Sequence, residues 1–489
     1  MGPAVVRLAI ALSFLSTVVA GTAEARPTDA SGTDLVRYDA GETVEHVDTA
    51  HFRVFFTRAG KDAVLAGDVD GDGTPDFVTQ VASLYEEVLA FYTGRGYLAP
   101  PSDAAQSNNG GDGRFDVYLV DFGGAADGRF QSEVCANARC TGYMAQENDF
   151  VGYAYPSPII GSRVVSSHEF FHAVQAGYNA TQSAIVSEGT AVWSTEQFDS
   201  TLSDLEGFVG GYLGHPDHSL DRTSATPVDP FTYGSAIFFQ FLGETLGRDV
   251  VLQLWQDCAP GAQGVADPEW FSALAALLQR QYATDFAATF TRFATWNLFT
   301  GARSDPSRAY AGGAGYPAIA TAPVTLPYAD PALRVFYASS QVLSVSPGDH
   351  TQLVVQIVPV GGASLDALRV VVAPVVGNTI GTVTTTQATA SPQPLDITSA
   401  TKILVALVQT AESGESARGT LCAGSPDEVA ACVAASAPAS DMGTSPVTKS
   451  SGGCDLGPQG APQGAPAAAL SCAVCGLALR RRARAVLRS

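Results

Sequence analysis

The chain has 489 residues, of which 46% are hydrophobic and only 15% are charged. It is therefore too apolar for a disordered protein and long enough for two or three domains with cores of their own. Acidic residues outnumber basic ones by 48 to 27, which gives a formal net charge of −21. Because so acidic a body repels phosphate backbones, we expect no nucleic-acid partner.

The first 25 residues are expected to form a secretory signal peptide. A single early charge, Arg7, precedes an apolar run from Leu8 to Ala20, and Ala23-Glu24-Ala25 then supplies an A-x-A cleavage pattern. The apolar run is too short for a membrane-spanning helix. We therefore expect an exported protein that begins near Arg26, with residues 26–49 as a polar N-terminal segment.

The C-terminal part reads as a linker followed by a sorting tail. Residues 436–464 are mostly Ala, Ser, Pro and Gly and include Gly452-Gly453-Cys454, whereas residues 465–489 form a short apolar stretch that ends in an Arg cluster. This order resembles the MYXO-CTERM tail of myxobacterial exported proteins. The resemblance implies a sorting peptidase that acts near Cys454, a place at the outer cell surface, and membrane contact only before processing.

The cysteine spacing predicts two local disulfides, as exported chains commonly contain. Cys135 and Cys140 bracket one short polar segment, and Cys422 and Cys432 bracket another. Cys258 is left over and is expected to be a buried thiol.

Periodicity divides the body of the chain into a mixed part and an all-β part. Up to residue 325 the pattern predicts strands, one of them at a sheet edge because of its prolines, and then mostly helices. The strands expected there are 51–57, 115–122 and the edge strand 151–160, and the helices are 77–92, 163–177, 183–198, 234–256, 268–281 and 283–298. Short Val/Thr/Ile runs then follow at 333–345, 352–359, 367–375, 379–387 and 402–410. We therefore expect an α+β domain over 50–325 and an all-β, sandwich-like domain over 330–435.

A His-Glu-x-x-His motif lies in the predicted helix 163–177. His168 and His172 are four residues apart, so their imidazoles share one helical face and can converge on one Zn²⁺. Glu169, one step round the helix, can take the proton of a water on that metal. The alternative is a helix in which both histidines are merely core or surface groups.

A catalytic zinc needs a third protein ligand. Glu188 stands at the start of the next predicted helix, which follows a short turn and so can face the two imidazoles. Glu196, eight residues further on, is the competing candidate.

The segment Glu188-Gly189-Thr190-Ala191-Val192-Trp193 resembles the third-ligand helix of gluzincin metallopeptidases. This resemblance implies a gluzincin-like fold with Glu188 as the ligand. A thermolysin-like enzyme would have an acid where this chain has Val192, so that subgroup is disfavoured. With the signal peptide, the acidic loop and the tail, the chain resembles a family of myxobacterial secreted zinc metalloproteases.

Zinc peptidases also stabilise the oxyanion that forms as water attacks the carbonyl. Tyr233 is the candidate for this role, because it precedes Gly234 in a segment similar to the catalytic-Tyr segment of the aminopeptidase-like group. His215 and His218 are the other candidates, and a Tyr packed at a helix N-terminus is the structural alternative. The edge strand 151–160 is expected to pair with an extended peptide substrate.

An acidic loop before the first predicted helix has the spacing of a calcium site. Its oxygen ligands at positions 1, 3, 5 and 9 are Asp68, Asp70, Asp72 and Asp76, and Gly73 at position 6 permits a sharp turn. Position 12 is Thr79 rather than Glu, so we expect weak binding. A solvated turn is the alternative.

These motifs together predict an exported zinc-dependent metalloendopeptidase that hydrolyses peptide bonds of peptide or protein substrates, with Zn²⁺ and possible Ca²⁺ as its ions. A non-catalytic surface adhesin on a metallopeptidase scaffold is one alternative. An aminopeptidase is the other, although it requires acidic groups that hold a free amino terminus.

Overall fold

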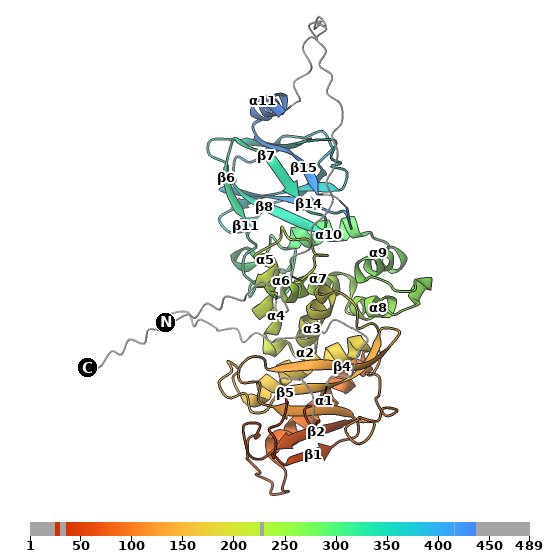
Figure 1. The fold of residues 1–489 in the computed structure, drawn as a ribbon. Coiled ribbons are helices and arrows are strands. Elements are labelled where there is room, and N and C mark those ends of the chain that lie inside the picture. The colour runs from red at the N-terminus through yellow and green to blue at the C-terminus, as the bar shows by residue number, and fades with distance from the viewer. Residues whose placement is uncertain (1–24, 30–35, 225–228, 415, 437–489) are drawn as a thin grey trace, which may run out of the picture. The chain divides into compact units, whose positions relative to one another are not determined.

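The computed structural model describes residues 25–29, 36–224, 229–414 and 416–436. Residues 1–24 of the expected signal peptide, almost all of the expected linker, and the sorting tail lie outside these described residues. The described chain is a mixed α+β structure with several sheets and a helical region, as the sequence predicted (Figure 1). Within the described ranges, no helix combines the length and the apolar character needed to cross a membrane.

The N-terminal sheet has five strands in the order β1-β2-β3-β5-β4. Strands β2, β3 and β5 run parallel, and β1 and β4 pair antiparallel at the two edges. Their bounds are β1 Val44–Asp48, β2 Phe52–Thr57, β3 Phe115–Val120, β4 Gly128–Ala136 and β5 Arg139–Glu147. Helix α1 (Asp76–Gly94) packs against this sheet, with Tyr85 in contact with Phe52 (ring centroids 5.4 Å apart).

The prediction of an edge strand over 151–160 was wrong. Residues 151–157 form turns and bends, and helix α2 begins at Pro158, because Ser157 caps that helix and proline is well suited to the first helical position. The edge nearest to α2 is instead strand β4, whose more polar sequence does not show regular alternation.

The helical region follows, and its described residues form no further strand before residue 322. Its helices are α2 Pro158–Ala176, α3 Ala184–Phe198, α4 Asp204–Phe208, α5 Gly210–Leu213, α6 Pro230–Gly234, α7 Ala236–Leu246, α8 Asp249–Asp257, α9 Trp270–Gln281 and α10 Phe286–Trp296. The single helix expected over 234–256 is divided, because Gly247 adopts a φ of +100° and ends α7.

Two antiparallel-rich sheets follow and share an apolar core, an arrangement consistent with a β-sandwich. The larger sheet has the order β11-β10-β14-β8-β6 with β12 on β10, and the smaller has the order β13-β9-β15-β7. The strands are β6 Ala322–Thr325, β7 Tyr328–Val335, β8 Ser339–Ser346, β9 Gln352–Pro359, β10 Leu368–Val376, β11 Thr379–Ile380, β12 Thr384–Gln387, β13 Leu395–Asp396, β14 Lys402–Gln409 and β15 Ala417–Gly424.

The larger sheet buries both of its faces. In β14, Ile403, Val405 and Leu407 face the core of the sandwich, whereas Leu404, Ala406 and Val408 belong to the cluster that includes the helical region. Side chains alternate between the two faces of a strand, so burial on both sides explains an uninterrupted apolar run.

Both predicted disulfides are confirmed. Cys135–Cys140 closes the β4–β5 hairpin, and Cys422–Cys432 joins β15 to helix α11 (Pro426–Ser436). The second pair was expected to bracket a loop, but it spans the end of a strand and a helix. Cys258 is a buried free thiol, as predicted.

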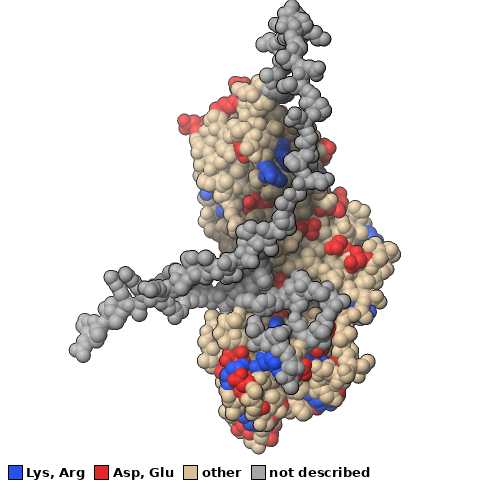
Figure 2. Space-filling model, in the orientation of Figure 1, with Lys and Arg blue, Asp and Glu red and all other residues tan. Residues whose placement is uncertain are grey.

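The start of the expected mature chain is part of the N-terminal domain. Arg26 is fully buried, and its guanidinium pairs with Asp103 at 2.6 Å, Glu133 at 2.7 Å and Asp116. Figure 2 shows acidic and basic side chains interspersed on the visible surface of this region. Elsewhere on the visible face, uncharged surface separates the charged groups.

Candidate metal centre

The His-Glu-x-x-His motif lies in the middle of α2, a helix buried on nearly all sides. Residues 177–183 connect α2 to α3 through a short loop that other elements hold in place. The Asn179 side chain donates to the carbonyl of Cys258 (3.0 Å), and the Gln182 side chain donates to the carbonyl of Pro268 (2.7 Å). These hydrogen bonds fix the loop and therefore the position from which α3 packs against α2.

Three predicted ligands meet where the two helices face each other. The Nε2 atoms of His168 and His172 lie 3.3 and 3.4 Å from the same Oε2 atom of Glu188. One ligand atom from each residue lies within 4.8 Å of the others. A tetrahedral zinc with nitrogen and oxygen ligands at about 2.0–2.1 Å separates its ligand atoms by about 3.3–3.4 Å, so the two separations from Glu188 fit this ion.

A second layer of side chains orients His172. Its Nδ1 lies 2.8 Å from Oε1 of Gln175, whose amide in turn donates to the Ser187 carbonyl (2.8 Å) and to Oγ1 of Thr190 (3.0 Å). With its amide nitrogen used in this way, Gln175 accepts the Nδ1 proton of His172 and leaves Nε2 free to bind a metal. Gln175 was not among the site residues predicted from the sequence, although its position three residues after His172 places it on the same helical face.

The charges of this buried group are strongly coupled. Burial alone raises the pKa of Glu188, but the charges and hydrogen bonds of the two imidazoles lower it to about 2. Burial lowers the pKa of His172, but the Glu188 carboxylate raises it to about 9. Without a metal, Glu188 is therefore ionised and paired with a protonated imidazole.

The glycine after Glu188 is required by packing. A Cβ atom on Gly189 would lie 2.3 Å from Oγ of Ser235 and 2.7 Å from the ring of Phe239. Such contacts are far below van der Waals distance, so only glycine permits α3 to approach the α6–α7 segment this closely.

Glu169 lies beside the edge strand rather than in open solvent. It is 1% exposed, and its Oε2 atom accepts a hydrogen bond from the backbone N–H of Phe130 in β4 (3.1 Å). Gly128 in the same strand has no room for a side chain, because a Cβ atom there would lie 2.2 Å from Val165 of α2. Strand β4 therefore crosses α2 closely at the position of the proposed base.

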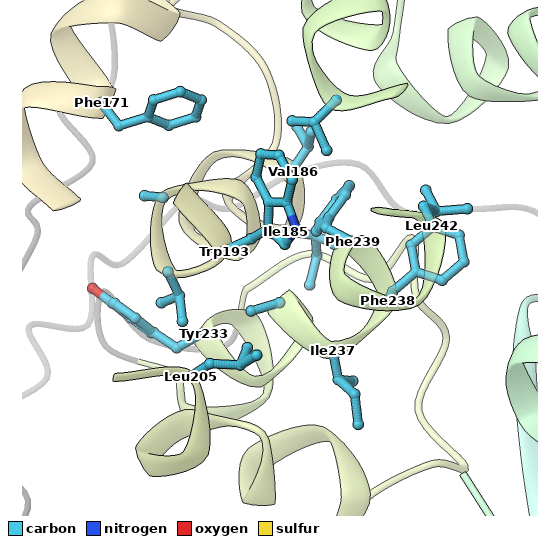
Figure 3. Packing of buried hydrophobic residues seen from close by; sticks show 14 of the residues in the cluster. Phe171, Ile185, Val186, Trp193, Leu205, Tyr233, Ile237, Phe238, Phe239 and Leu242 are labelled. Carbon is cyan, nitrogen blue, oxygen red and sulfur yellow. The ribbon is translucent and has the colours of Figure 1, made fainter. Parts of the chain in front are cut away.

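Tyr233 reaches the same centre from α6. Its ring lies parallel to that of His168, with centroids 6.0 Å apart and planes 13° from parallel, and it stacks on Phe208 on another side. Figure 3 shows the Tyr233 hydroxyl pointing away from the buried apolar side chains around Trp193.

The other candidates are placed elsewhere. Burial and the negative charges of Glu206 and Asp204 raise the pKa of Glu196 to about 7, so Glu196 faces acids rather than the imidazoles. His215 and His218 stack on each other at 5.0 Å, and His218 contacts Arg222.

The acidic loop forms a second group of oxygen atoms. Carboxylate oxygens of Asp68, Asp70 and Asp76 lie within 4.8 Å of one another, and Gly73 adopts a φ of +89° at the predicted turn. The Asp72 side chain is not part of this group and accepts a hydrogen bond from the Thr74 backbone N–H (2.7 Å). Calcium binding remains a prediction, since these carboxylates also accept hydrogen bonds that stabilise the loop.

Comparisons with known proteins add no assignment. Neither the search against protein-family models nor the search of curated proteins finds a match.

Proposed function

We propose that the protein is a zinc-dependent metalloendopeptidase, with His168, His172 and Glu188 as zinc ligands and Glu169 as general base. The observation that supports this most directly is the pair of 3.3 and 3.4 Å separations from the imidazoles to one Glu188 oxygen. In addition, Nε2 of His172 is buried and is directed at this Glu188 oxygen, while its Nδ1 atom is bonded to Gln175. A histidine oriented in this way presents Nε2 to a metal.

A zinc ion at this position would supply Lewis acidity, which polarises a peptide carbonyl and lowers the pKa of water. The chain supplies the proton transfers. Glu169 removes a proton from the attacking water and later delivers it to the leaving amine, and its hydrogen bond from Phe130 fixes the carboxylate in position. Tyr233 is the proposed donor to the oxyanion that develops on the substrate.

The outer edge of β4 is the proposed binding surface for the substrate backbone. Among the described strands, β4 pairs with β5 alone, and it crosses α2 at Glu169. An extended peptide that adds to this edge would place its backbone beside the proposed base. Because strand addition does not require a chain terminus, this arrangement favours an endopeptidase.

We also propose that the protein acts outside the cytoplasm. Its two disulfides are the structural support, because disulfides persist in oxidising compartments.

The test is Glu169→Gln, which keeps the shape of the side chain but cannot accept the proton. Zinc content should stay near one ion per chain, while turnover of an internally quenched peptide should fall by about 10²–10⁴-fold. The matched control is Glu412→Gln, at an exposed residue, which should change neither quantity. Full turnover by Glu169→Gln, or wild-type protein that binds zinc and cleaves no peptide, would contradict the proposal and favour a non-catalytic binding protein.

A further inference from the structure

Two carboxylates near the metal centre each have a buried oxygen without a hydrogen-bond partner among the described residues. Asp127 is 1% exposed, and Tyr155 donates to its Oδ2 atom. Its Oδ1 atom is buried and has no hydrogen-bond partner among the described residues, and the same is true of Oδ2 of Asp204. Unpartnered charged oxygens in a protein interior are costly, so they call for an explanation.

The two acids belong to segments whose other residues contact the centre. Asp127 directly precedes β4, three residues before Phe130, whose N–H donates to Glu169. Asp204 is the first residue of α4, and Phe208 of the same helix stacks on Tyr233 at 5.1 Å. Tyr233 lies against His168 in turn.

Electrostatics places both acids in one region with the metal ligands. Burial raises the pKa of Asp204 to about 6. The charge of Asp127 adds to this rise, and the charge of His168 opposes it. Burial likewise raises the pKa of Asp127 to about 6, with Glu169 adding to the rise and His168 opposing it. Each acid therefore feels the charge of His168, and Asp204 also feels that of Asp127.

A bound zinc ion would not balance these charges. Its two positive charges are matched by the carboxylates of Glu188 and Glu169, so the charges of Asp127 and Asp204 remain in excess. Among the described residues, His168 alone favours the ionised form of Asp204, whereas Asp127 and Glu206 oppose it. The region is therefore complementary to a positively charged group, which none of the described residues supplies at the two unpaired oxygens.

We propose that Asp127 and Asp204 form a subsite for a cationic group of the substrate, an ammonium or a guanidinium. This inference rests on the peptidase function proposed above and specifies its substrate class. Tyr155 donates to one oxygen of Asp127, and the other oxygen has no hydrogen-bond partner among the described residues. The group bound is either the side chain of Lys or Arg or the free α-amino group of a peptide, and both have the same chemistry.

The experiment compares three kinds of quenched peptide. The first kind is N-acetylated and carries one Lys, placed in turn at each position flanking the scissile bond. The second is the acetylated peptide with Gln at these positions, and the third is the Gln peptide with a free amino terminus. The proteins are wild type, Asp127→Asn, Asp204→Asn and the control Asp349→Asn, at an exposed residue of the loop between β8 and β9.

For the wild-type protein, kcat/KM should be at least about tenfold higher for either the Lys-containing peptides or the free-amine peptide than for the acetylated Gln peptide. Asp127→Asn and Asp204→Asn should each reduce this ratio by about tenfold, and Asp349→Asn should leave it unchanged. The preferred kind, Lys-containing or free amine, identifies the source of the charge. Equal turnover of all peptides by wild type, or a preference that survives in both variants, would overturn the inference.

Binding separates this inference from the proposed function. Calorimetric titration of the same peptides into Glu169→Gln protein, with and without Asp204→Asn, measures recognition without turnover. If hydrolysis fails but cationic peptides still bind at least about tenfold more tightly in an Asp204-dependent manner, the subsite stands and the peptidase proposal falls. If hydrolysis depends on Glu169 but charge has no effect on binding, the peptidase stands and the subsite falls. An increased melting temperature of Asp204→Asn would show that the protein folds and that the carboxylate is unpaired in the free protein.

Discussion

Replacing Glu188 by Gln tests which acid of helix α3 completes the metal centre. The matched variant is Glu196→Gln, which makes the same chemical change eight residues further along the same helix. Eight residues of α-helix span about 12 Å, so Glu196 is too far along the helix to replace Glu188 between the imidazoles. Removal of Glu188 leaves two protein ligands, and removal of Glu196 leaves all three.

The expected loss of stability in the metal-free protein follows from the ion pair. A fall of the Glu188 pKa from 4.5 to about 2 corresponds to about 3 kcal/mol of folding free energy at neutral pH. The rise of the His172 pKa from 6.5 to about 9 describes the same pair, so the two contributions are not added.

The direction of the pH dependence follows from the two shifts. Because the pKa of Glu188 is lower in the folded state, its contribution is complete above about pH 4.5 and is lost as the pH falls through about 2. Because the pKa of His172 is higher in the folded state, its contribution is complete below about pH 6.5 and is lost as the pH rises through about 9. The pair therefore stabilises the metal-free protein most between about pH 4.5 and about pH 6.5.

The assays are zinc content by mass spectrometry after dialysis and urea unfolding of the chelated proteins at pH 5.5. Wild type and Glu196→Gln should retain about one zinc per chain, whereas Glu188→Gln should lose nearly all of it. The unfolding free energy of metal-free Glu188→Gln should be lower than that of wild type by about 3 kcal/mol. The ligand assignment is refuted if Glu196→Gln empties the site while Glu188→Gln keeps its zinc.

Two further predictions concern regions outside the centre. Arg26→Ala should lower the unfolding free energy by about 3–5 kcal/mol in urea titrations, because it leaves three buried carboxylates without their cation. The control Arg58→Ala breaks the exposed pair with Glu45 and should lower the unfolding free energy by at most about 1 kcal/mol, so similar losses in the two variants would contradict this account. Calcium should raise the melting temperature of the wild-type protein, and Asp70→Ala should abolish that response with zinc still bound; an unchanged response would mean that the acidic loop is only a turn.

Local patterns were sufficient for most elements that carry the candidate site. The i, i+4 spacing of His168 and His172 and the apolar periodicity around them predict a helix with both imidazoles on one face, and α2 has this form. The short connection to α3 likewise predicts that Glu188 faces them, since closely connected helices pack side by side. The cysteine spacing was enough for both disulfides, because the paired residues are only 5 and 10 positions apart in the sequence.

Long-range packing decided the rest. The sequence placed the sheet edge at residues 151–160, whereas β4 occupies it, because the order of strands in a sheet depends on pairing between distant segments. Asp127 and Asp204 are 77 positions apart and belong to no motif, and only the tertiary packing of β4 and α4 brings their charges together. Whether a carboxylate is solvated or buried without a partner depends on that packing, and for this reason the proposed cation subsite could not be predicted from the sequence.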